Sequence, residues 1–150
     1  MGNANPLAGR SILVVEDEPL IAWELLQIFA DEGAKSLLAR TYKQAIHLAQ
    51  TDHLSAAVLD CGCGDDVQMT TLCGHIAKRQ IPYMFYTGYT KLDETQCNIL
   101  LVRKPASREV LLRALTQLIL SSRILPSPAV DHSYQPEPSR QPPQENVHRY

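Results

Sequence analysis

The chain has 150 residues, enough for one domain of ordinary size with a substantial core. Its 14 basic residues oppose 16 acidic ones, so its bulk charge gives no electrostatic case for binding nucleic acid. No apolar run approaches the roughly 20 residues that span a bilayer, and residues 1–6 lack the pattern of a secretory signal. We therefore expect a cytoplasmic protein without membrane insertion, whose 4 cysteines are reduced thiols.

The first segment predicts a buried strand followed by a helix. Ser11–Val15 is a continuous apolar run, typical of a strand buried on both faces. Pro19 suits the first turn of a helix that we predict over Leu20–Ala30, and Gly33 suits its end. The apolar residues near helical spacing in this helix, where we interpret Trp23 as a packing residue, are Leu20, Trp23, Leu26, Ile28 and Phe29.

The next segment repeats the strand and helix order. Thr41 is a suitable cap for a helix over Tyr42–Gln50, with Ala45, Leu48 and Ala49 on its inner side. The strands predicted on either side of this helix are Ser36–Ala39 and Ala56–Asp60.

The second half continues the alternation. A helix is predicted over Met69–Lys78, although Gly74 weakens it. Two further strands are predicted at Ile81–Tyr86 and Ile99–Val102. Ser107 caps a final helix through about Leu120, whose predicted buried stripe is Val110, Leu111, Ala114, Leu115 and Leu118.

Strands that alternate with helices indicate a doubly wound α/β fold. We predict a flavodoxin-like, five-stranded parallel sheet with strand order 2-1-3-4-5. Only Tyr89 to Asn98 separate the last two strands, and a parallel crossover usually needs a dozen or more residues. A short or absent fourth helix is therefore expected there.

The chain divides into three parts by composition. Residues 10–123 form the predicted domain, and residues 1–9 are expected to be flexible. Six of the 10 prolines lie between Pro126 and Pro143, among polar residues. Residues 124–150 are therefore predicted to be a disordered, proline-rich tail.

Polar groups stand where several of these strands end. Glu16 and Asp17 follow the first strand, and Asp60 ends the third. Because the carboxyl ends of parallel strands meet at one crevice, these carboxylates are expected to converge there. Mg²⁺ prefers such oxygen ligands. We predict Asp17 and Asp60 as direct ligands, Glu16 acting through water, and the Gly62 carbonyl as a further ligand.

The same crevice has the parts needed to accept a phosphoryl group. An ionised carboxylate such as Asp60 is a nucleophile toward phosphorus. In-line transfer depends mainly on charge neutralisation. Lys104 supplies a positive charge, Thr87 a hydroxyl donor, and Gly88 leaves space for the donor to approach.

This set of motifs resembles the receiver domain of two-component response regulators, over about Ser11 to Leu120. The matching residues are Glu16, Asp17, Asp60, Thr87 and Lys104 followed by Pro105. The resemblance implies phosphorylation of Asp60 by a histidine kinase, Mg²⁺ dependence, a cis Lys104–Pro105 bond, and no enzymatic activity beyond slow self-dephosphorylation.

A shorter motif, Phe85-Tyr86-Thr87-Gly88-Tyr89, resembles a subgroup of stand-alone receivers with a Phe-x-Thr-Gly-Tyr signature. That resemblance implies a single-domain response regulator, a poorly formed fourth helix, and a kinase of the HWE type. It would signal through contacts with another protein, which the sequence does not identify.

A departure from the family leaves other functions open. Leu101 stands where many receivers have a switching aromatic residue, for which Tyr89 is a candidate substitute. One alternative is therefore a pseudo-receiver that binds proteins without being phosphorylated. Another is a small haloacid-dehalogenase-like phosphatase, but Gly62 stands where such an enzyme needs a second aspartate.

The cysteines suggest two further sites. Cys61, Cys63, Cys73 and His75 are ligand types for zinc, but their spacing matches no common zinc module. A redox role for Cys61 is more plausible, because it adjoins Asp60.

Overall fold

The computed structural model describes residues 4–88 and 99–122. Its strands are Ser11–Val15 (β1), Lys35–Ala39 (β2), Ala56–Leu59 (β3), Tyr83–Thr87 (β4) and Leu100–Arg103 (β5). Its helices are Pro19–Asp31 (α1), Tyr42–Thr51 (α2), Asp66–Lys78 (α3) and Arg108–Ser121 (α4). The connection predicted to hold a short or absent fourth helix, Tyr89 to Asn98, lies outside the described residues, as does the tail at 124–150.

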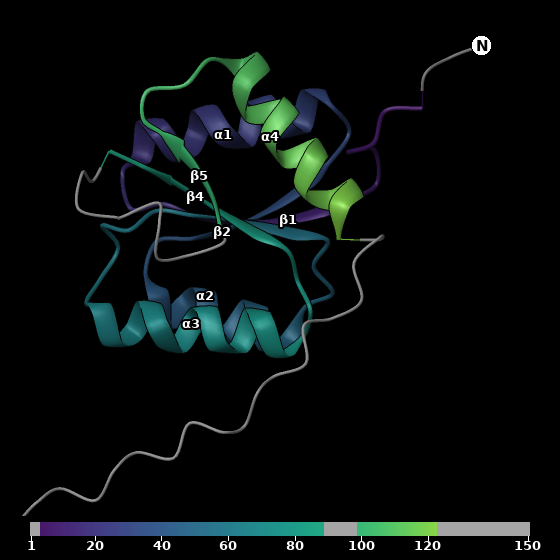
Figure 1. Cartoon of the computed structure of the whole chain (residues 1–150). Coiled ribbons are helices and arrows are strands. Elements are labelled where there is room, and N and C mark those ends of the chain that lie inside the picture. Colours follow the sequence, from purple (N-terminus) through teal and green to yellow (C-terminus); the bar gives the residue numbers. More distant parts are fainter. Residues whose placement is uncertain (1–3, 89–98, 123–150) are drawn as a thin grey trace, which may run out of the picture.

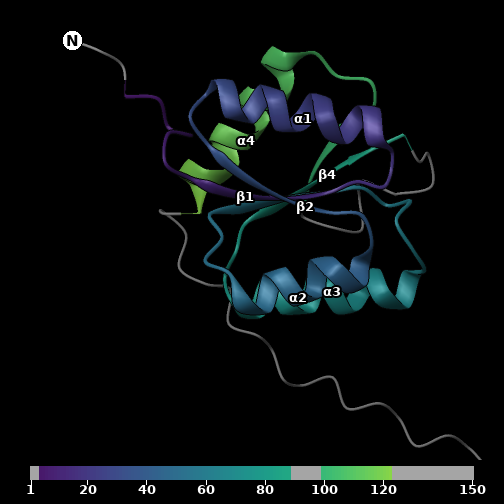
Figure 2. The same cartoon turned by 180° about the vertical axis from the view of Figure 1, so that it is seen from behind.

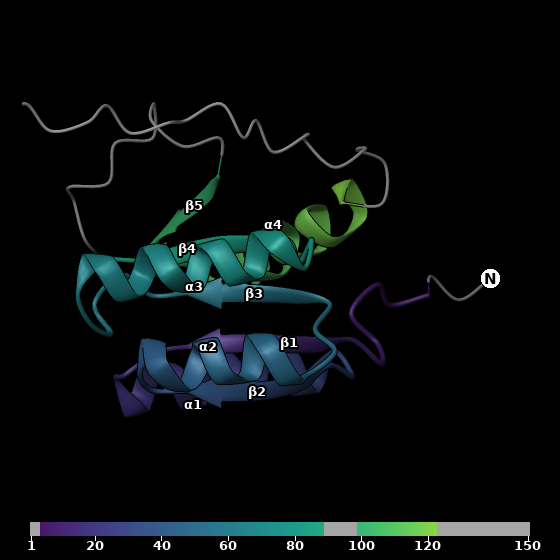
Figure 3. The same ribbon diagram turned by 90° about the horizontal axis from the view of Figure 1, so that it is seen from below.

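The five strands form one parallel sheet in the order β2-β1-β3-β4-β5, which confirms the predicted flavodoxin-like topology. Val15 at the end of β1 pairs with Ala39 of β2 and with Leu59 of β3. The carboxyl ends of these three neighbouring strands therefore lie at the same end of the sheet, as Figure 3 shows.

Helices cover both faces of the sheet. The helices α1 and α4 lie on one face, and α2 and α3 lie on the other (Figures 1 and 2). Since successive strand residues point to opposite faces, β1 contributes to two cores. Ile12 and Val14 pack under α1 and α4, whereas Leu13 and Val15 pack under α2 and α3.

Side-chain caps fix where three helices begin. The Thr41 hydroxyl accepts a hydrogen bond from Gln44 N at 3.2 Å, and the Ser107 hydroxyl accepts one from Val110 N at 3.3 Å, as both predicted caps require. Asp65 caps α3 in the same way. This cap begins α3 three residues before the predicted start at Met69.

The buried face of α1 differs from the predicted one. Leu20 and Trp23 are 80% and 63% exposed, so the interpretation of Trp23 as a packing residue was wrong. The residues of α1 that are buried are Ala22, Leu25, Ile28 and Phe29. The buried stripe of α1 includes the small residue Ala22, whose weak hydrophobicity does not stand out in the sequence. The larger apolar residues Leu20 and Trp23 are exposed instead.

A similar shift affects α4. Val110 was expected on the buried stripe but is 46% exposed. The fully buried positions are Leu111, Leu115 and Ile119, which lie at a regular spacing of four residues.

The N-terminal segment contributes one core residue. Leu7 is 1% exposed and packs in the core beneath α1 and α4. Flexibility of residues 1–9 stays a prediction. Among the described helices, none combines the length and the apolar character that crossing a bilayer requires.

Candidate functional site

The backbone ladder holds three polar residues just beyond their strands. Asp60 N donates to Val15 O at 2.9 Å, and Glu16 N donates to Ala39 O at 3.0 Å. Lys104 N donates to the carbonyl of Thr87, at 3.0 Å. Main-chain pairing of neighbouring strands therefore fixes where the side chains of Glu16, Asp60 and Lys104 begin.

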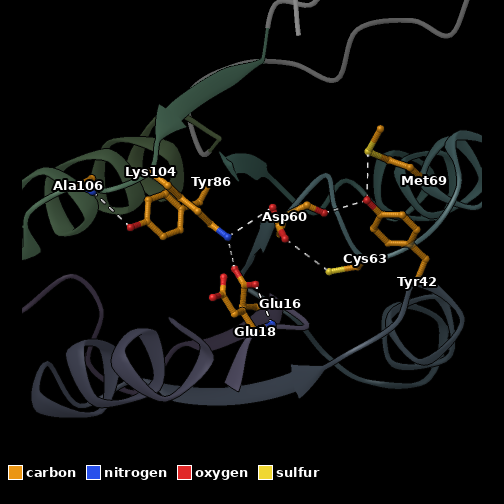
Figure 4. Close-up of polar contacts among 9 residues, drawn as sticks. All are labelled: Glu16, Glu18, Tyr42, Asp60, Cys63, Met69, Tyr86, Lys104 and Ala106. Carbon is orange, nitrogen blue, oxygen red and sulfur yellow. Dashed lines mark hydrogen bonds and ion pairs between the residues drawn. The ribbon is translucent and has the colours of Figure 1, made fainter. Parts of the chain in front are cut away.

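Lys104 brings the two buried carboxylates together. Its Nζ lies 2.5 Å from Glu16 Oε2 and 3.5 Å from Asp60 Oδ1 (Figure 4). Glu16 is 1% and Asp60 8% exposed. Burying a carboxylate is costly unless it is paired and hydrogen-bonded, so this amine compensates for placing both groups out of water.

Both oxygens of Glu16 are engaged. While Oε2 accepts from Lys104, Oε1 accepts from the backbone N–H of Glu18 at 3.1 Å. Burial raises the pKa of Glu16, and the hydrogen bond from Lys104 opposes that rise only in part. Burial would lower the pKa of Lys104, but its hydrogen bond to Glu16 and the charge of Asp60 outweigh burial and raise it. This bonding suits Glu16 to orienting Lys104 rather than to binding an ion directly.

The ring of Tyr86 contacts the same amine. Lys104 Nζ lies 5.5 Å from the centroid of the buried Tyr86 ring, within the range of a cation–π contact. The Tyr86 hydroxyl accepts a hydrogen bond from Ala106 N at 3.3 Å (Figure 4). The Lys104–Pro105 peptide between them is cis, as the family resemblance implied. The sequence analysis missed this role of Tyr86, which was assigned only to a strand.

A group of possible metal ligands lies beside the amine. Within residues 4–88 and 99–122, one set of three candidate donors converges: Asp17, Asp60 and Cys63, each with a ligand atom within 4.8 Å of the others. Asp17 is exposed and Asp60 is buried, so an ion bound there would remain accessible from solvent. Carboxylate oxygens suit a hard divalent cation, so Asp17 and Asp60 fit Mg²⁺.

Gly62 lies directly against the phosphoacceptor candidate. A Cβ at this position would be 3.3 Å from Asp60 Oδ2, which is tighter than about nine in ten real Cβ contacts. The role of the Gly62 carbonyl as a metal ligand stays a prediction.

Tyr42 fixes the loop that carries Asp60. Its hydroxyl donates to Asp60 O at 2.8 Å, its side chain is fully buried, and Met69 Sδ lies 3.6 Å from the same hydroxyl (Figure 4). A Cβ on Gly64 would lie 2.7 Å from the Tyr42 ring, so the loop packs closely on it. The sequence analysis missed this contact, for which the only local signal is a large aromatic residue directly after the Thr41 cap.

The predicted switch residues surround the same edge. Thr87 is 1% exposed at the end of β4, and its side chain partly opposes the burial that raises the pKa of the Cys61 thiol to about 11. Gly88 is exposed, and a Cβ there would meet only Lys104 Cβ at 3.9 Å, which leaves the approach open. Tyr89, the candidate second switch, lies outside the described residues.

The cysteines are arranged differently from either sequence hypothesis. Cys63, rather than the neighbouring Cys61, faces the carboxylate, with its Sγ 3.9 Å from Asp60 Oδ2. Cys73 and His75 lie on α3, and neither belongs to the convergent ligand group found in the described residues. His75 instead contacts Gln50, at 3.4 Å.

Comparison with known proteins finds likeness in structure rather than in sequence. No family model matches the chain, and no curated protein matches it. A receiver domain of a sensor histidine kinase from Pseudomonas aeruginosa PAO1, with magnesium coordinated in its active-site cleft, is 23% identical. The match covers 75% of this chain and 98% of that one, with a TM-score of 0.65.

Two further solved structures are similar to this chain in fold. A CheY-like response regulator receiver domain protein from Methanospirillum hungatei JF-1 is 19% identical, covering 78% of this chain and 98% of its own, with a TM-score of 0.69. The response regulator PhyR from Brucella abortus is also 19% identical, covering 81% and 52%, with a TM-score of 0.68. The chain thus has the fold of response-regulator receiver domains.

Proposed function

We propose that this chain is a receiver that accepts a phosphoryl group on Asp60 from a histidine kinase, with Mg²⁺, and signals through protein–protein contacts. The observation that carries the proposal is the position of Lys104 Nζ between Glu16 and Asp60, beside the exposed carboxylate of Asp17. Its stand-alone character rests on the motif from Phe85 to Tyr89.

In this proposal each group has a distinct part in phosphoryl transfer. A carboxylate oxygen of Asp60 attacks the phosphorus of the donor, the bond from phosphorus to the donor breaks, and its electron pair leaves with the donor. Asp17, Asp60 and the Gly62 carbonyl would hold the cation, which would supply charge neutralisation for the transfer. Lys104 pairs with the negative charge of the added phosphoryl group, and the Thr87 hydroxyl donates a hydrogen bond to a phosphoryl oxygen.

Lys104 changes partner in this account. Its closer carboxylate is now Glu16, at 2.5 Å, whereas Asp60 lies at 3.5 Å. A phosphoryl group brings roughly −1.5 to −2 charges to the Asp60 side, so the amine is drawn from Glu16 toward it. We propose that the Thr87 hydroxyl then turns toward the added phosphoryl group.

Phosphate acceptance rather than catalysis is the proposed activity, with at most slow self-dephosphorylation. A sensor histidine kinase receiver among the similar structures supports a kinase as the partner class. The HWE type is proposed from the Phe85–Tyr89 motif alone. The downstream partner would be a protein, without a role for nucleic acid or for membrane insertion.

A phosphate-affinity gel after treatment with acetyl phosphate tests the proposal. Wild-type protein should shift in Mg²⁺ but not in a chelator, and Asp60→Asn should not shift. Asp31→Asn, which alters an exposed carboxylate at the end of α1, is the matched control and should shift normally. A shift that survives Asp60→Asn, or that ignores Mg²⁺, contradicts the proposal.

One observation favours the pseudo-receiver alternative. Leu101 of β5 packs against the core beneath α2 and α3, so this position offers no aromatic side chain that can change orientation. Beryllofluoride, which mimics a phosphoryl group, separates the two hypotheses once a binding partner is known. Affinity for the partner that is unchanged by beryllofluoride favours the pseudo-receiver, and a changed affinity favours the phosphorylated receiver.

A further inference from the structure

A sulfur atom completes the ligand group at the rim of the sheet. Cys63 Sγ lies 3.9 Å from Asp60 Oδ2, and both atoms belong to the group in which Asp17 also takes part (Figure 4). Cys63 is half-buried in the loop between β3 and α3. Nothing in the proposed Mg²⁺ site uses this thiol, because Mg²⁺ prefers oxygen.

Mixed sulfur and oxygen ligands are typical of a different class of cation. Zinc and its neighbours bind thiolate and carboxylate together, with ligand distances of about 2.0–2.3 Å that set donor atoms roughly 3.5 Å apart in a tetrahedral site. The observed separation of 3.9 Å between Cys63 and Asp60 is close to this value. The other donor pairs of the group are separated by at most 4.8 Å.

The local charge also favours a divalent cation. Glu16, Asp17 and Asp60 carry three carboxylates against the one amine of Lys104, which leaves a net charge of about −2 when all are ionised. Lys104 is held by Glu16 on the side away from Cys63, as Figure 4 shows. Lys104 Nζ lies 3.5 Å from Asp60 Oδ1, whereas Cys63 Sγ lies 3.9 Å from Asp60 Oδ2, so the amine and the thiol face different oxygens of the same carboxylate.

We propose that Cys63 is a third protein ligand, with Asp17 and Asp60, for a thiophilic divalent cation of the zinc class. This inference rests on the proposed function, because both use the same two carboxylates. On binding, the S–H bond of Cys63 breaks, its proton passes to solvent, and the sulfur donates an electron pair to the ion without any change in oxidation state. Such an ion competes with Mg²⁺ for one position, so it controls whether Asp60 can be phosphorylated.

Cobalt is the probe for this site, because a thiolate ligand gives Co²⁺ a charge-transfer band in the near ultraviolet. The reduced full-length chain, free of added thiols, should develop this band, and Cys63→Ser should lose it. Loss of a residue that only hydrogen-bonds to a metal ligand costs about 10- to 100-fold in metal affinity. Loss of the Cys63 ligand in Cys63→Ser should therefore weaken Co²⁺ binding, measured by calorimetry, at least about tenfold. Its Mg²⁺ affinity should change much less.

Two matched variants remove thiols elsewhere. Cys61→Ser and Cys73→Ser should keep the band, since these two side chains lie outside the ligand group. Cys63→Ala repeats the test if circular dichroism shows that Cys63→Ser does not fold. No band in the wild type, or a band that persists without Cys63, overturns the proposal.

The result can be separated from failure of the proposed function. Phosphorylation of the wild-type chain in Mg²⁺ requires no thiolate, whereas the Co²⁺ band requires no phosphoryl donor. Normal phosphorylation without a band overturns only the role of Cys63. A Cys63-dependent band without phosphorylation supports the metal site and overturns the receiver function.

Discussion

Lys104 is held closer to Glu16 than to Asp60, with Nζ–oxygen distances of 2.5 Å and 3.5 Å. The fully buried Glu16 is thus the closer partner of the amine in the unphosphorylated chain. The less buried Asp60 keeps its Oδ2 near Cys63, at the carboxyl end of the sheet. This asymmetry gives the amine a second partner to move toward when charge is added to Asp60.

Removing the amine should destabilise the protein strongly. In Lys104→Met, Glu16 stays buried without its cation, and breaking a buried pair in this way costs about 3 kcal/mol or more in the free energy of unfolding. Urea unfolding in metal-free buffer at neutral pH measures this loss. Arg108→Met is the control, because Arg108 pairs with Asp31 and Glu32 on the surface and should lose far less. Equal losses would show that the buried pair contributes no more than the exposed one.

Two glycine substitutions should change stability in opposite directions. Gly64→Ala puts a Cβ 2.7 Å from the Tyr42 ring and should cost about 1–3 kcal/mol through overpacking. Gly74→Ala, inside α3 with nothing within 4 Å of its Cβ, should stabilise the protein by about 0.5–1 kcal/mol. Chemical unfolding of both variants checks the expectation. A harmless Gly64→Ala would mean that Tyr42 does not confine the loop.

Magnesium should stabilise the folded chain through the acidic rim. At a concentration of about 100 times its dissociation constant, a bound ion adds about 2.7 kcal/mol to the free energy of unfolding. Thermal unfolding with Mg²⁺ and with a chelator should show this gain in wild-type protein and not in Asp17→Asn. Glu24→Gln removes an exposed carboxylate of α1 outside the ligand group, and this control should keep the full gain. A gain retained by Asp17→Asn would place the ion elsewhere.

The thiols near Asp60 should make the metal-free protein less stable in alkali. Burial raises the pKa of Cys61 from 9.0 to about 11 and that of Cys63 to about 12. Above pH 9 the folded state therefore keeps thiol protons that the unfolded chain releases. The contribution of these thiols to the free energy of unfolding is fully present below pH 9 and is lost as the pH rises toward about 11 to 12. Urea unfolding at pH 9 and at pH 11 should show a smaller fall for the double variant Cys61→Ser with Cys63→Ser. The same fall in both proteins would rule out the thiols as its cause.

Sequence patterns were sufficient for the topology and for several of the groups that meet at the sheet edge. Continuous apolar strands define a parallel sheet, and the rule that strand ends converge predicts from sequence alone that Glu16, Asp60 and Lys104 lie together. These residues lie far apart in the chain, but each directly follows its strand, so the ladder alone determines their position.

The remaining features depend on tertiary packing, which local patterns do not encode. Trp23 has the hydrophobicity of a core residue, yet the core side of α1 is set by small Ala22. Tyr42 reaches Asp60 only because α2 packs beside the loop after β3. The choice between Cys61 and Cys63 as the thiol facing Asp60 depends on a loop turn that spacing does not predict.

Chemical trapping tests the central claim most directly. Borohydride reduces an aspartyl phosphate to homoserine, so peptide mapping after treatment with a phosphoryl donor and Mg²⁺ identifies the modified residue. This account predicts homoserine at position 60 in wild-type protein, and a greatly reduced yield in Asp17→Asn. Homoserine at any other aspartate, or none at all while a positive-control receiver is labelled, would contradict it.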